Sequence, residues 1–589
     1  MNNNFKRLFL LTAVLMLLVG ISAAAAADDG NAATTDAVSV DDTATDVDAS
    51  AIDNNNHMEK NTQTKEVKKD SSTHIVNNDN VDDIFSGENY TLADDINDGD
   101  TLDFQGTIDK NHTLIINKAV NAYSSTKDAL ISLHSVSKDK LGTDPGNLFC
   151  LNIGASGSVV TDLYLYNTQF WVHNAHDIIF ANMTMYVQNQ SIGGGVGQTA
   201  IRYSDNILMD NCTIYTENNG GSSSFVLTYS SNCTIQNSRI EGQGNVGNIV
   251  YVGNQFNYQD IPEGFVKASV SNKVINCTII APNTTSSCVP IQNTGTLSLL
   301  EENKLYTSGS VIQSGTNGTV RNNILNQGCG ISLSANSTAY NNTVMGSGST
   351  SIAANCTVTN NTLGKVTING ANVTFTDNKV KDLLTLSQPM NLKNNNLSAI
   401  TLNANSKNSN ITDNNINGAI AVNAVNITIK ENNINTTNET AVVVTTDGVV
   451  VANNSIYSAT KSGNNAVKTS KTSTLIEGNT PDSMTFTITD ETYSQFFDEK
   501  GELINPQVTS YSTLILDGTF NNKSFVLTNV TVTINGNDAV LNDGKILVTD
   551  QAIAVIDNIT FVNTNIDSSV IFDTNYNILR NSRITKTFT

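Results

Sequence analysis

The chain has 589 residues and a formal net charge of −22 at pH 7, with only 15% charged residues. Phosphate binding needs a basic surface, so this composition argues against nucleic acid as a partner. The seven cysteines are an odd number in a chain too long to need a disulfide framework, and they contain no Cys-x-x-Cys motif.

The first residues form a targeting signal. Lys6 and Arg7 precede an apolar run from Leu8 to Val19, and small residues near Ala25 to Ala27 offer a cleavage site. This pattern predicts a secretory signal peptide over residues 1–27. An uncleaved membrane anchor is the alternative, although the apolar run is short for a membrane span.

The residues that follow are acidic. From Asp28 to Glu59 there are nine acidic residues and no Lys or Arg, so we predict a disordered spacer over residues 28–79. No later stretch is long and apolar enough to cross a membrane. We therefore expect a secreted protein located at the cell surface.

A short phrase then recurs along the chain. It consists of an apolar residue, two mostly polar residues, an asparagine, one further residue and a second apolar residue, and its copies lie 17 to 22 residues apart. A unit this short cannot bury its own apolar face, so the copies must stack on one another. The asparagines in register are Asn303, Asn323, Asn342, Asn361, Asn378, Asn395, Asn414, Asn432 and Asn454.

The residues between these asparagines indicate strands. Apolar and polar residues alternate in Val366–Ile368 and Ile427–Ile429, and the runs are rich in Val, Ile and Thr. About 19 residues suffice for one coil of a parallel β-solenoid whose coils pair at roughly 4.8 Å. Asparagine tolerates left-handed turns and can form a hydrogen-bonded ladder along the stack. We therefore predict an all-β chain with a parallel β-helix over residues 80–480 and a structural asparagine ladder.

The earlier coils have longer connections. Variants of the phrase occur at 180–182, 208–214, 235–240 and 274–279, separated by insertions. Insertions in a solenoid form loops on one face, which is often the binding face. We expect recognition to depend on residues 186–205, 215–230, 241–272 and 280–298.

The region after Pro481 repeats the beginning of the β-helix. Residues 101–108 match 513–520, and residues 159–168 match 555–564. We predict that residues 481–589 begin a second β-helix module. Since the terminal coils of a solenoid need capping, we expect this module to be truncated.

Sugar cleavage would require paired carboxylates, or acidic metal ligands together with a base. The candidates are Asp205 and Asp210 beside Arg202, Glu241 near Arg239, and Asp260 with Glu263. None of these groups recurs on stacked strands, and isolated acids near basic residues are usually solvated pairs. We therefore predict no catalytic residue.

Two further clusters are candidate metal or acid–base sites. His173, His176 and Asp177 lie near Trp171, but the duplicate has Phe572, Asn575 and Tyr576 instead, which favours a structural role. The acidic turn from Asp94 to Asp100 lacks the ligand spacing of an EF-hand, which leaves a weak surface calcium site as an alternative. We predict no metal and no cofactor.

Four cysteines lie between an asparagine and a threonine, and we expect them to stack as small buried hydrophobic residues: Cys212, Cys233, Cys277 and Cys356. Roughly twenty Asn-x-Ser/Thr sequons, such as Asn89 and Asn372, fit a glycoprotein. An Asn- and Thr-rich repeat also generates such sequons by chance.

The leader, the acidic spacer, the Asn-Asn-x-Ile coils and the Tyr493–Asp498 to Asp517–Phe520 module opening resemble adhesin-like surface proteins of methanogenic archaea. This resemblance implies a right-handed parallel β-helix of the pectate-lyase-like type. It also implies attachment to cells, host material or glycans.

Three functions follow from this fold, which does not itself decide among them. We expect a non-enzymatic adhesin, a monomeric rod that presents loops to glycans or surface proteins of other cells. The first alternative is a polysaccharide lyase or glycoside hydrolase, and the second is a structural component of the cell envelope. About 20 coils would span on the order of 100 Å, which suits display beyond a cell wall.

Overall fold

The computed structural model describes residues 71–589 except 134–147, 189–198, 218–222, 255–267, 282–287, 308–310, 347, 460, 482–483, 564–567 and 587–589. The predicted signal peptide and the predicted spacer up to residue 70 lie outside the described residues. Among the residues described, no helix has the length and apolar character needed to cross a membrane.

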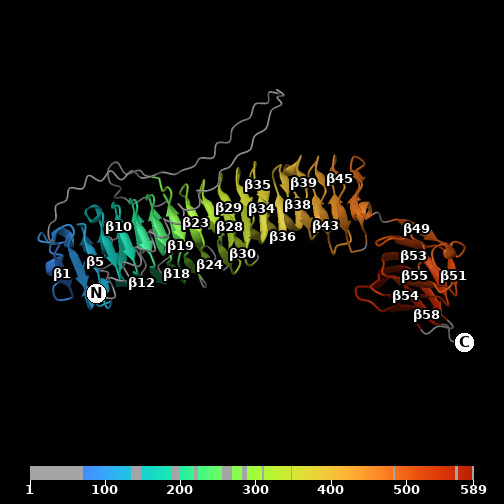
Figure 1. Cartoon of the computed structure of the whole chain (residues 1–589), viewed down its shortest axis with the longest axis horizontal. Helices are drawn as coiled ribbons and strands as arrows, with labels where there is room; N and C mark the ends of the chain where they lie inside the picture. Colours follow the sequence, from blue (N-terminus) through green and yellow to red (C-terminus); the bar gives the residue numbers. More distant parts are fainter. Residues whose placement is uncertain are drawn as a thin grey trace, which may run out of the picture. The chain divides into compact units, whose positions relative to one another are not determined.

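Residues 73–481 form a parallel β-helix, in which most coils contribute one strand to each of three faces (Figure 1). All the named strands of these faces pair in parallel with the strands of the neighbouring coils. We call the faces sheet A, sheet B and sheet C, in the order in which a coil passes through them. This arrangement establishes the all-β, parallel β-helix class.

The 18 strands of sheet A are β1 (Thr73–Val76), β2 (Thr101–Phe104), β5 (Asn121–Tyr123), β8 (Val159–Thr161), β11 (Ile179–Ala181), β14 (Leu208–Asp210), β17 (Thr234–Gln236), β20 (Lys273–Ile275), β23 (Leu299–Glu301), β26 (Thr319–Arg321), β29 (Thr338–Tyr340), β32 (Thr357–Thr359), β35 (Thr374–Thr376), β37 (Asn391–Lys393), β39 (Asn410–Thr412), β42 (Thr428–Lys430), β45 (Val450–Ala452) and β48 (Leu475–Glu477). The strands of sheet B are β3 (Thr107–Lys110), β6 (Leu130–Leu133), β9 (Tyr164–Tyr166), β12 (Thr184–Gln188), β15 (Thr213–Glu217), β18 (Arg239–Gln243), β21 (Thr278–Ala281), β24 (Lys304–Thr307), β27 (Ile324–Asn326), β30 (Thr343–Val344), β33 (Thr362–Leu363), β36 (Lys379–Leu386), β38 (Asn396–Leu402), β40 (Asn415–Ile416), β43 (Asn433–Asn435) and β46 (Ser455–Tyr457). Sheet C contains β4 (Leu114–Ile116), β7 (Leu148–Leu151), β10 (Gln169–His173), β13 (Thr199–Arg202), β16 (Phe225–Thr228), β19 (Asn248–Gly253), β22 (Val289–Asn293), β25 (Val311–Gln313), β28 (Gly330–Leu333), β31 (Ser349–Ile352), β34 (Lys365–Ile368), β41 (Ile420–Val422), β44 (Val442–Val444) and β47 (Val467–Thr469). Strands β36 and β38 pass through both B and C.

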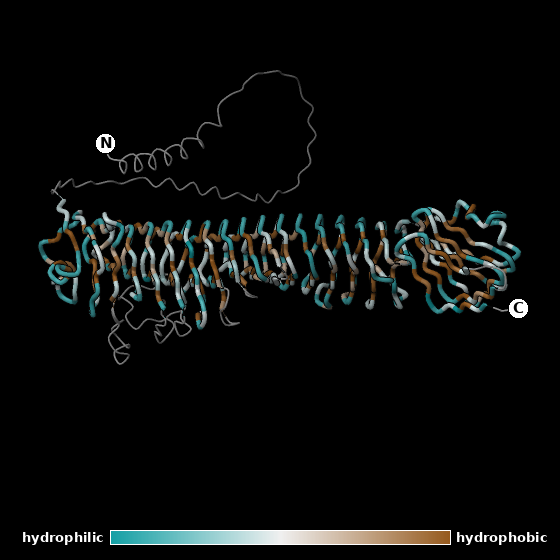
Figure 2. The backbone as a smooth tube through the Cα atoms, turned by 90° about the horizontal axis from the view of Figure 1, so that it is seen from below, coloured by the Kyte–Doolittle hydropathy of each residue, from teal (hydrophilic) through white to brown (hydrophobic). Residues whose placement is uncertain are grey.

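The coil from β26 to β28 shows how the sequence produces this geometry. Its apolar residues Val320, Leu325 and Ile331 point into the coil, where they are buried, and polar residues alternate with them. Between sheets A and B the chain turns at Asn322, whose φ of 58° is left-handed. Asparagine tolerates this conformation, so the same residue type occupies the turn of many coils. In Figure 2 the hydrophilic turns form one continuous edge of the stack.

A capping segment covers the first coil. It consists of α2 (Val81–Ile84), η1 (Glu88–Tyr90) and the residues around them. Val81, Phe85, Leu92 and Ile96 are buried in the same hydrophobic core as the coils. Further single turns of 3₁₀ helix lie along the β-helix: η3 (Ile153–Ala155), η4 (Ala404–Ser406) and η5 (Gly463–Ala466).

The predicted boundary between spacer and β-helix at residue 80 was wrong by a few residues. Strand β1, from Thr73 to Val76, pairs in register with β2 and belongs to the first coil. Buried Asp100 fixes its start by accepting a hydrogen bond from the backbone N–H of Ser72 at 2.8 Å. The acidic composition of the preceding residues concealed this strand.

Residues 484–586 form a second set of parallel coils with their own hydrophobic core. Their elements are β49 (Thr485–Ile488), η6 (Tyr493–Gln495), β50 (Thr513–Leu516), β51 (Thr519–Asn521), β52 (Ser524–Thr528), β53 (Thr531–Asn542), β54 (Lys545–Thr549), β55 (Ile553–Asn563), β56 (Val570–Phe572), β57 (Ile578–Arg580) and β58 (Arg583–Lys586). The pairing of Thr73 with Thr101 recurs as Thr485 with Thr513, which is the same position 412 residues later. The two openings are therefore structural as well as sequence duplicates.

Candidate functional site

The nine register asparagines occupy one column inside the turn between sheets A and B. Their side chains are 0–3% exposed. In each, the side-chain oxygen accepts the backbone N–H of the residue one coil earlier, as Asn323 Oδ1 does from Asn303 at 2.9 Å. The side-chain amide donates to backbone carbonyls and to the next asparagine, as Asn342 does to Asn361 at 2.9 Å. Asn479 continues the column by accepting from Asn454, and its own side-chain amide donates to Asn464 of η5 at 2.8 Å.

Other residue types occupy this column in earlier coils. The backbone N–H of Cys277 donates to Asn303, and that of Cys212 donates to the hydroxyl of Ser238, so both cysteines lie in the column. Cys233 instead lies in the turn between sheets C and A, where its N–H donates to Asn272. The expectation of one stack for the four cysteines was therefore wrong, because identical Asn-Cys-Thr phrases serve two different turns.

All seven cysteines are buried and reduced. Burial raises the pKa of the Cys212 and Cys233 thiols to about 12 and that of Cys277 to about 11. These thiols stay protonated at neutral pH and contribute to packing.

The candidate functional site lies on the outside of the early coils, where sheet B meets sheet C. The insertions 134–147, 189–198, 218–222, 282–287 and 308–310 all connect a sheet B strand to a sheet C strand. They lie outside the described residues, and we call this edge the loop-bearing edge. The predicted recognition ranges contain these insertions, except 134–147 and 308–310, together with strand residues on either side of them.

Three tyrosines line the outer face of sheet B beside this edge. Tyr166 stacks on Tyr186 with ring centroids 5.7 Å apart, and Tyr186 stacks on Tyr215 at 4.5 Å. Parallel pairing places them in one register, one coil apart. Because the ring faces cover one another, the row presents ring edges and hydroxyl groups outward.

Amide and carboxylate side chains continue this row. The Gln188 amide donates to Glu217 at 2.6 Å, and the Tyr215 hydroxyl donates to the same carboxylate at 3.3 Å. One coil further, Glu241 occupies the register position of Tyr215 and accepts from Arg239 at 2.6 Å and from Gln243 at 2.9 Å. We call these residues together with the tyrosines the outer polar row: Tyr166, Tyr186, Gln188, Tyr215, Glu217, Arg239, Glu241 and Gln243.

Tyr215 remains protonated in this setting. Burial, together with the negative charge of Glu217, raises the pKa of Tyr215 to about 12. Its hydroxyl is therefore a hydrogen-bond donor and a poor general base at neutral pH.

The outer face of sheet C bears a cationic and aromatic group at the ends of β10 and β13, next to the turn into sheet A. The Arg202 guanidinium lies 3.9 Å from the centre of the Trp171 ring and donates to His173 Nδ1 at 3.2 Å. Because a guanidinium group can only donate, Nδ1 of His173 accepts and the imidazole is neutral in this contact. Tyr203 packs against His173 and stacks on Tyr229 at 5.3 Å. Arg202 is only 6% exposed.

The acids proposed beside Arg202 do not converge on it, whereas Glu241 does meet Arg239. Asp210 lies on sheet A, where it accepts from Gln236 and Asn237, whereas Arg202 lies on sheet C. Asp205 lies in the following turn and accepts the backbone N–H of Ser231. Asp260 and Glu263 lie outside the described residues.

The histidine cluster is divided by the fold. His173 points toward Arg202 on sheet C, whereas His176 is bonded to the adjacent Asp177 at 2.8 Å on the exposed turn. Within the described residues, no group of three or more His, Cys, Asp or Glu side chains could hold a metal ion.

A lysine side chain lies against the acidic turn from Asp94 to Asp100. The Lys118 ammonium donates to the backbone carbonyls of Ala93 and Ile96, both at 2.6 Å. These carbonyls are of the kind that would bind calcium in such a turn. A lysine one coil away thus supplies the positive charge, and no signal within the turn itself predicts this.

Sequence reasoning missed the contact between His173 and Arg202. The phrase at Asn182 recurs at Asn211, 29 residues later, and the same offset relates His173 to Arg202, which pair in parallel register. Applying the 29-residue offset between the two asparagines to the neighbouring strands would have predicted this contact.

No protein-family model matches the sequence, and no curated protein sequence matches it. Among solved structures, the surface adhesin PfbA of Streptococcus pneumoniae aligns with 87% of this chain and 89% of its own, with 9% identity and a TM-score of 0.20. The tailspike protein of E. coli bacteriophage HK620, in complex with a pentasaccharide, covers 82% and 74%, with 13% identity and a TM-score of 0.25. The PL6 family alginate lyase AlyGC covers 87% and 76%, with 10% identity and a TM-score of 0.22. Because these TM-scores are low, we base the fold on the strand pairing and the function on the residues of the site.

Proposed function

We propose that this chain is a secreted, surface-displayed adhesin-like protein that attaches to glycans or cell surfaces through the loop-bearing edge and the outer polar row. The observation that supports this proposal is the tyrosine stack with its bonded carboxylate and amide side chains, which lies on the early coils, among those with inserted loops. In the later coils, the sheet B position that stacks in register with Arg239 is occupied by residues such as Thr343, Lys379 and Asn415.

The chemistry of the row suits a hydroxyl-rich polymer. Carboxylates, amides, tyrosine hydroxyls and a guanidinium provide both donors and acceptors on a flat parallel sheet. Their spacing of about 4.8 Å from coil to coil gives a repeating set of contacts along an extended chain. A long stack of coils holds these groups rigid, which lowers the entropic cost of binding.

The alternative is a polysaccharide lyase or glycosidase, and one observation favours it. Arg202 could partner an anionic sugar, and a neutral His173 would become a base once its Nδ1 lone pair is released from the guanidinium. However, the guanidinium is buried against Trp171, and two of the acids proposed from the sequence, Asp210 and Glu241, lie on other faces. We therefore rank attachment above cleavage.

The test incubates the purified full-length chain with a panel of plant, host and microbial polysaccharides. We expect retention of one or more intact polymers in an affinity gel, without released oligosaccharides by mass spectrometry. A Glu217→Gln variant should lose retention, whereas Lys379→Ala, on the outer face of a later coil, should keep it.

Release of defined products that disappears in a His173→Ala variant would replace the adhesin with the enzyme. Absence of both binding and release, together with self-association of the protein, would instead favour the structural envelope component.

A further inference from the structure

Most Asn-x-Ser/Thr sequons of the β-helix follow from the geometry of its turns. In these sequons an asparagine with positive φ precedes a buried residue, and the threonine or serine that follows opens the next strand. Asn341 is an example, with Asn342 buried behind it and Thr343 as the first residue of β30. The fold alone therefore accounts for twelve sequons: Asn182, Asn211, Asn232, Asn276, Asn317, Asn336, Asn341, Asn355, Asn360, Asn372, Asn426 and Asn453.

Several of these turn asparagines are bonded within the stack. Asn355 Nδ2 donates to Asn336 Oδ1 of the preceding coil at 3.0 Å, and Asn372 Nδ2 donates to Asn355 Oδ1 at 3.2 Å. Sites on successive coils lie only about 4.8 Å apart, so sugar chains on neighbouring sites would compete for the same space. The turn sequons are therefore poor acceptors of a glycan in the folded chain.

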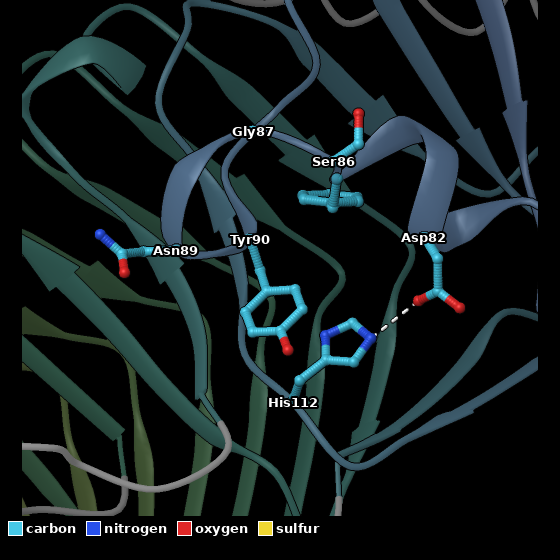
Figure 3. A pocket seen from close by; sticks show the side chains of 7 residues that line it. Asp82, Ser86, Gly87, Asn89, Tyr90 and His112 are labelled. Carbon is cyan, nitrogen blue, oxygen red and sulfur yellow. Dashed lines mark hydrogen bonds and ion pairs between the residues drawn. The ribbon is translucent and has the colours of Figure 1, made fainter.

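One sequon lies outside the coils. Asn89-Tyr90-Thr91 spans the end of η1 in the capping segment, and Asn89 is exposed. Among the residues that the structure describes, the Asn89 amide has no hydrogen-bond partner. Figure 3 shows this amide directed away from the Tyr90 ring and from His112. An Asn-x-Thr tripeptide in a surface loop of a secreted protein is the usual acceptor of an N-linked glycan.

The surface around Asn89 is open. A hollow of about 530 Å³ lies beside the capping segment, and its walls include Asp82, Asn89, Tyr90 and His112. Tyr90 is 48% exposed, and its ring stacks on His112 with centroids 4.1 Å apart and planes 9° from parallel. His112 Nε2 in turn lies 2.7 Å from the Asp82 carboxylate. The loop that carries Asn89 is thus held in place, while space remains beside it for a bulky group.

The fold does not require this sequon. The capping loop recurs in the second module, where the bridge between Glu502 and Val526 repeats the bridge between Thr91 and Ile115, 411 residues later. The same offset replaces the sequon by a different tripeptide: Lys500, Gly501 and Glu502. A loop that caps a coil therefore forms without an Asn-x-Thr sequence.

The middle residue of the sequon carries a conformational cost. Tyr90 has a positive φ of 60°, and Gly501, at the same position of the second module, has a positive φ of 82°. A bulky residue in this conformation is an outlier, whereas glycine adopts it freely. The backbone alone favours glycine here. Positions that break such a local rule are expected where a sequence serves a function besides folding.

We propose that Asn89 carries an N-linked glycan. This inference rests on the secretion included in the proposed function, because the modification takes place on exported chains. Asn89 Nδ2 forms a bond to the anomeric carbon of an oligosaccharide carried on a lipid phosphate. The bond between that carbon and the phosphate oxygen breaks, and the lipid phosphate leaves. The amide nitrogen gives one proton to a base of the transferase.

The test is mass spectrometry of intact glycopeptides from the chain secreted by the cells that naturally produce it. We expect a glycan on most copies of the peptide that contains Asn89, and on few copies of the peptides that contain Asn355 or Asn372. Asn89→Gln and Thr91→Ala should abolish the modification, whereas Thr91→Ser, which keeps the hydroxyl of the sequon, should retain it. The matched control Asn355→Gln, at a similar positive φ of 58°, should leave the glycan on Asn89 unchanged.

An unmodified Asn89 in a secreted chain that has lost its leader would overturn the proposal, as would heavier modification of the coil turns than of Asn89. Either result would leave the proposed adhesion intact, because polymer retention depends on the outer polar row. Glu217→Gln should abolish retention without changing the glycan on Asn89. Failure of export would contradict both the proposed surface display and this inference.

Discussion

Removing one side chain from the asparagine column should destabilise a single coil strongly. The amide of Asn342 accepts from the backbone and side-chain nitrogens of Asn323 and donates to the Val320 and Tyr340 carbonyls and to Asn361. A net contribution of about 1 kcal/mol for each bond would give roughly 5 kcal/mol. Because two amide hydrogens are shared among three acceptors and one oxygen is shared between two donors, we count three effective interactions and expect about 3 kcal/mol for Asn342→Ala.

Matched variants separate hydrogen bonding from backbone effects. Ser238 holds the equivalent position, accepting the N–H of Cys212 at 3.0 Å and donating to the carbonyl two residues before it. Asn342→Ser should therefore recover about half of the loss. Asn341→Gly, at the exposed left-handed turn next to it, should cost less than about 1 kcal/mol, since glycine favours positive φ.

The assay is native-state hydrogen exchange followed by mass spectrometry on peptides covering residues 319–345. Coils interact mainly with their neighbours, so the effect should be local. A loss of 3 kcal/mol corresponds to roughly a hundredfold faster exchange of the Asn323 amide. Equal exchange in Asn342→Ala and Asn341→Gly would refute the role assigned to the column.

Three further predictions concern other parts of the described structure. Burial raises the pKa of Asp100, but hydrogen bonds from the N–H groups of Ser72 and Asn97 and from His74 outweigh it and lower the pKa below its ordinary value of 3.8. The charged carboxylate should therefore stabilise β1 at neutral pH, and this stabilisation should be lost as the pH falls below about 4. Faster hydrogen exchange in β1 at pH 3 than at pH 7 tests this, and a pH response that survives in Asp100→Asn would contradict it. All seven thiols should resist iodoacetamide in the folded chain and react after denaturation, because they are buried and the pKa of several is raised. Mass spectrometry counts the modified cysteines. Rapid labelling of the folded chain would contradict the prediction by showing exposed thiols. Tyr215→Phe should weaken polymer retention several-fold without lowering the melting temperature, because the ring stack remains while the hydroxyl donor is lost. Unchanged retention in an affinity gel would remove Tyr215 from the binding surface.

The sequence alone determined the coil. Most inward strand positions are apolar, and the turn between sheets A and B buries a backbone N–H that needs an acceptor. The requirement recurs from coil to coil and leaves a periodic signal around residues such as Asn323 and Asn342. The parallel strands, the stacking and the duplication of the opening all follow from that signal. It was weakest at β1, where the pattern occurs once and within acidic surroundings.

The tertiary structure decided which side chains meet between coils. Loops of different lengths alter the sequence distance between stacked positions, so Arg202 reaches His173 across 29 residues, and Lys118 reaches the acidic turn from another coil. The hollow at Tyr90 likewise depends on a loop after α2 and a connection after β3 that share no pattern. A repeat encodes what every coil has in common. The candidate sites depend on residues that differ from coil to coil, and only the folded stack brings these residues together.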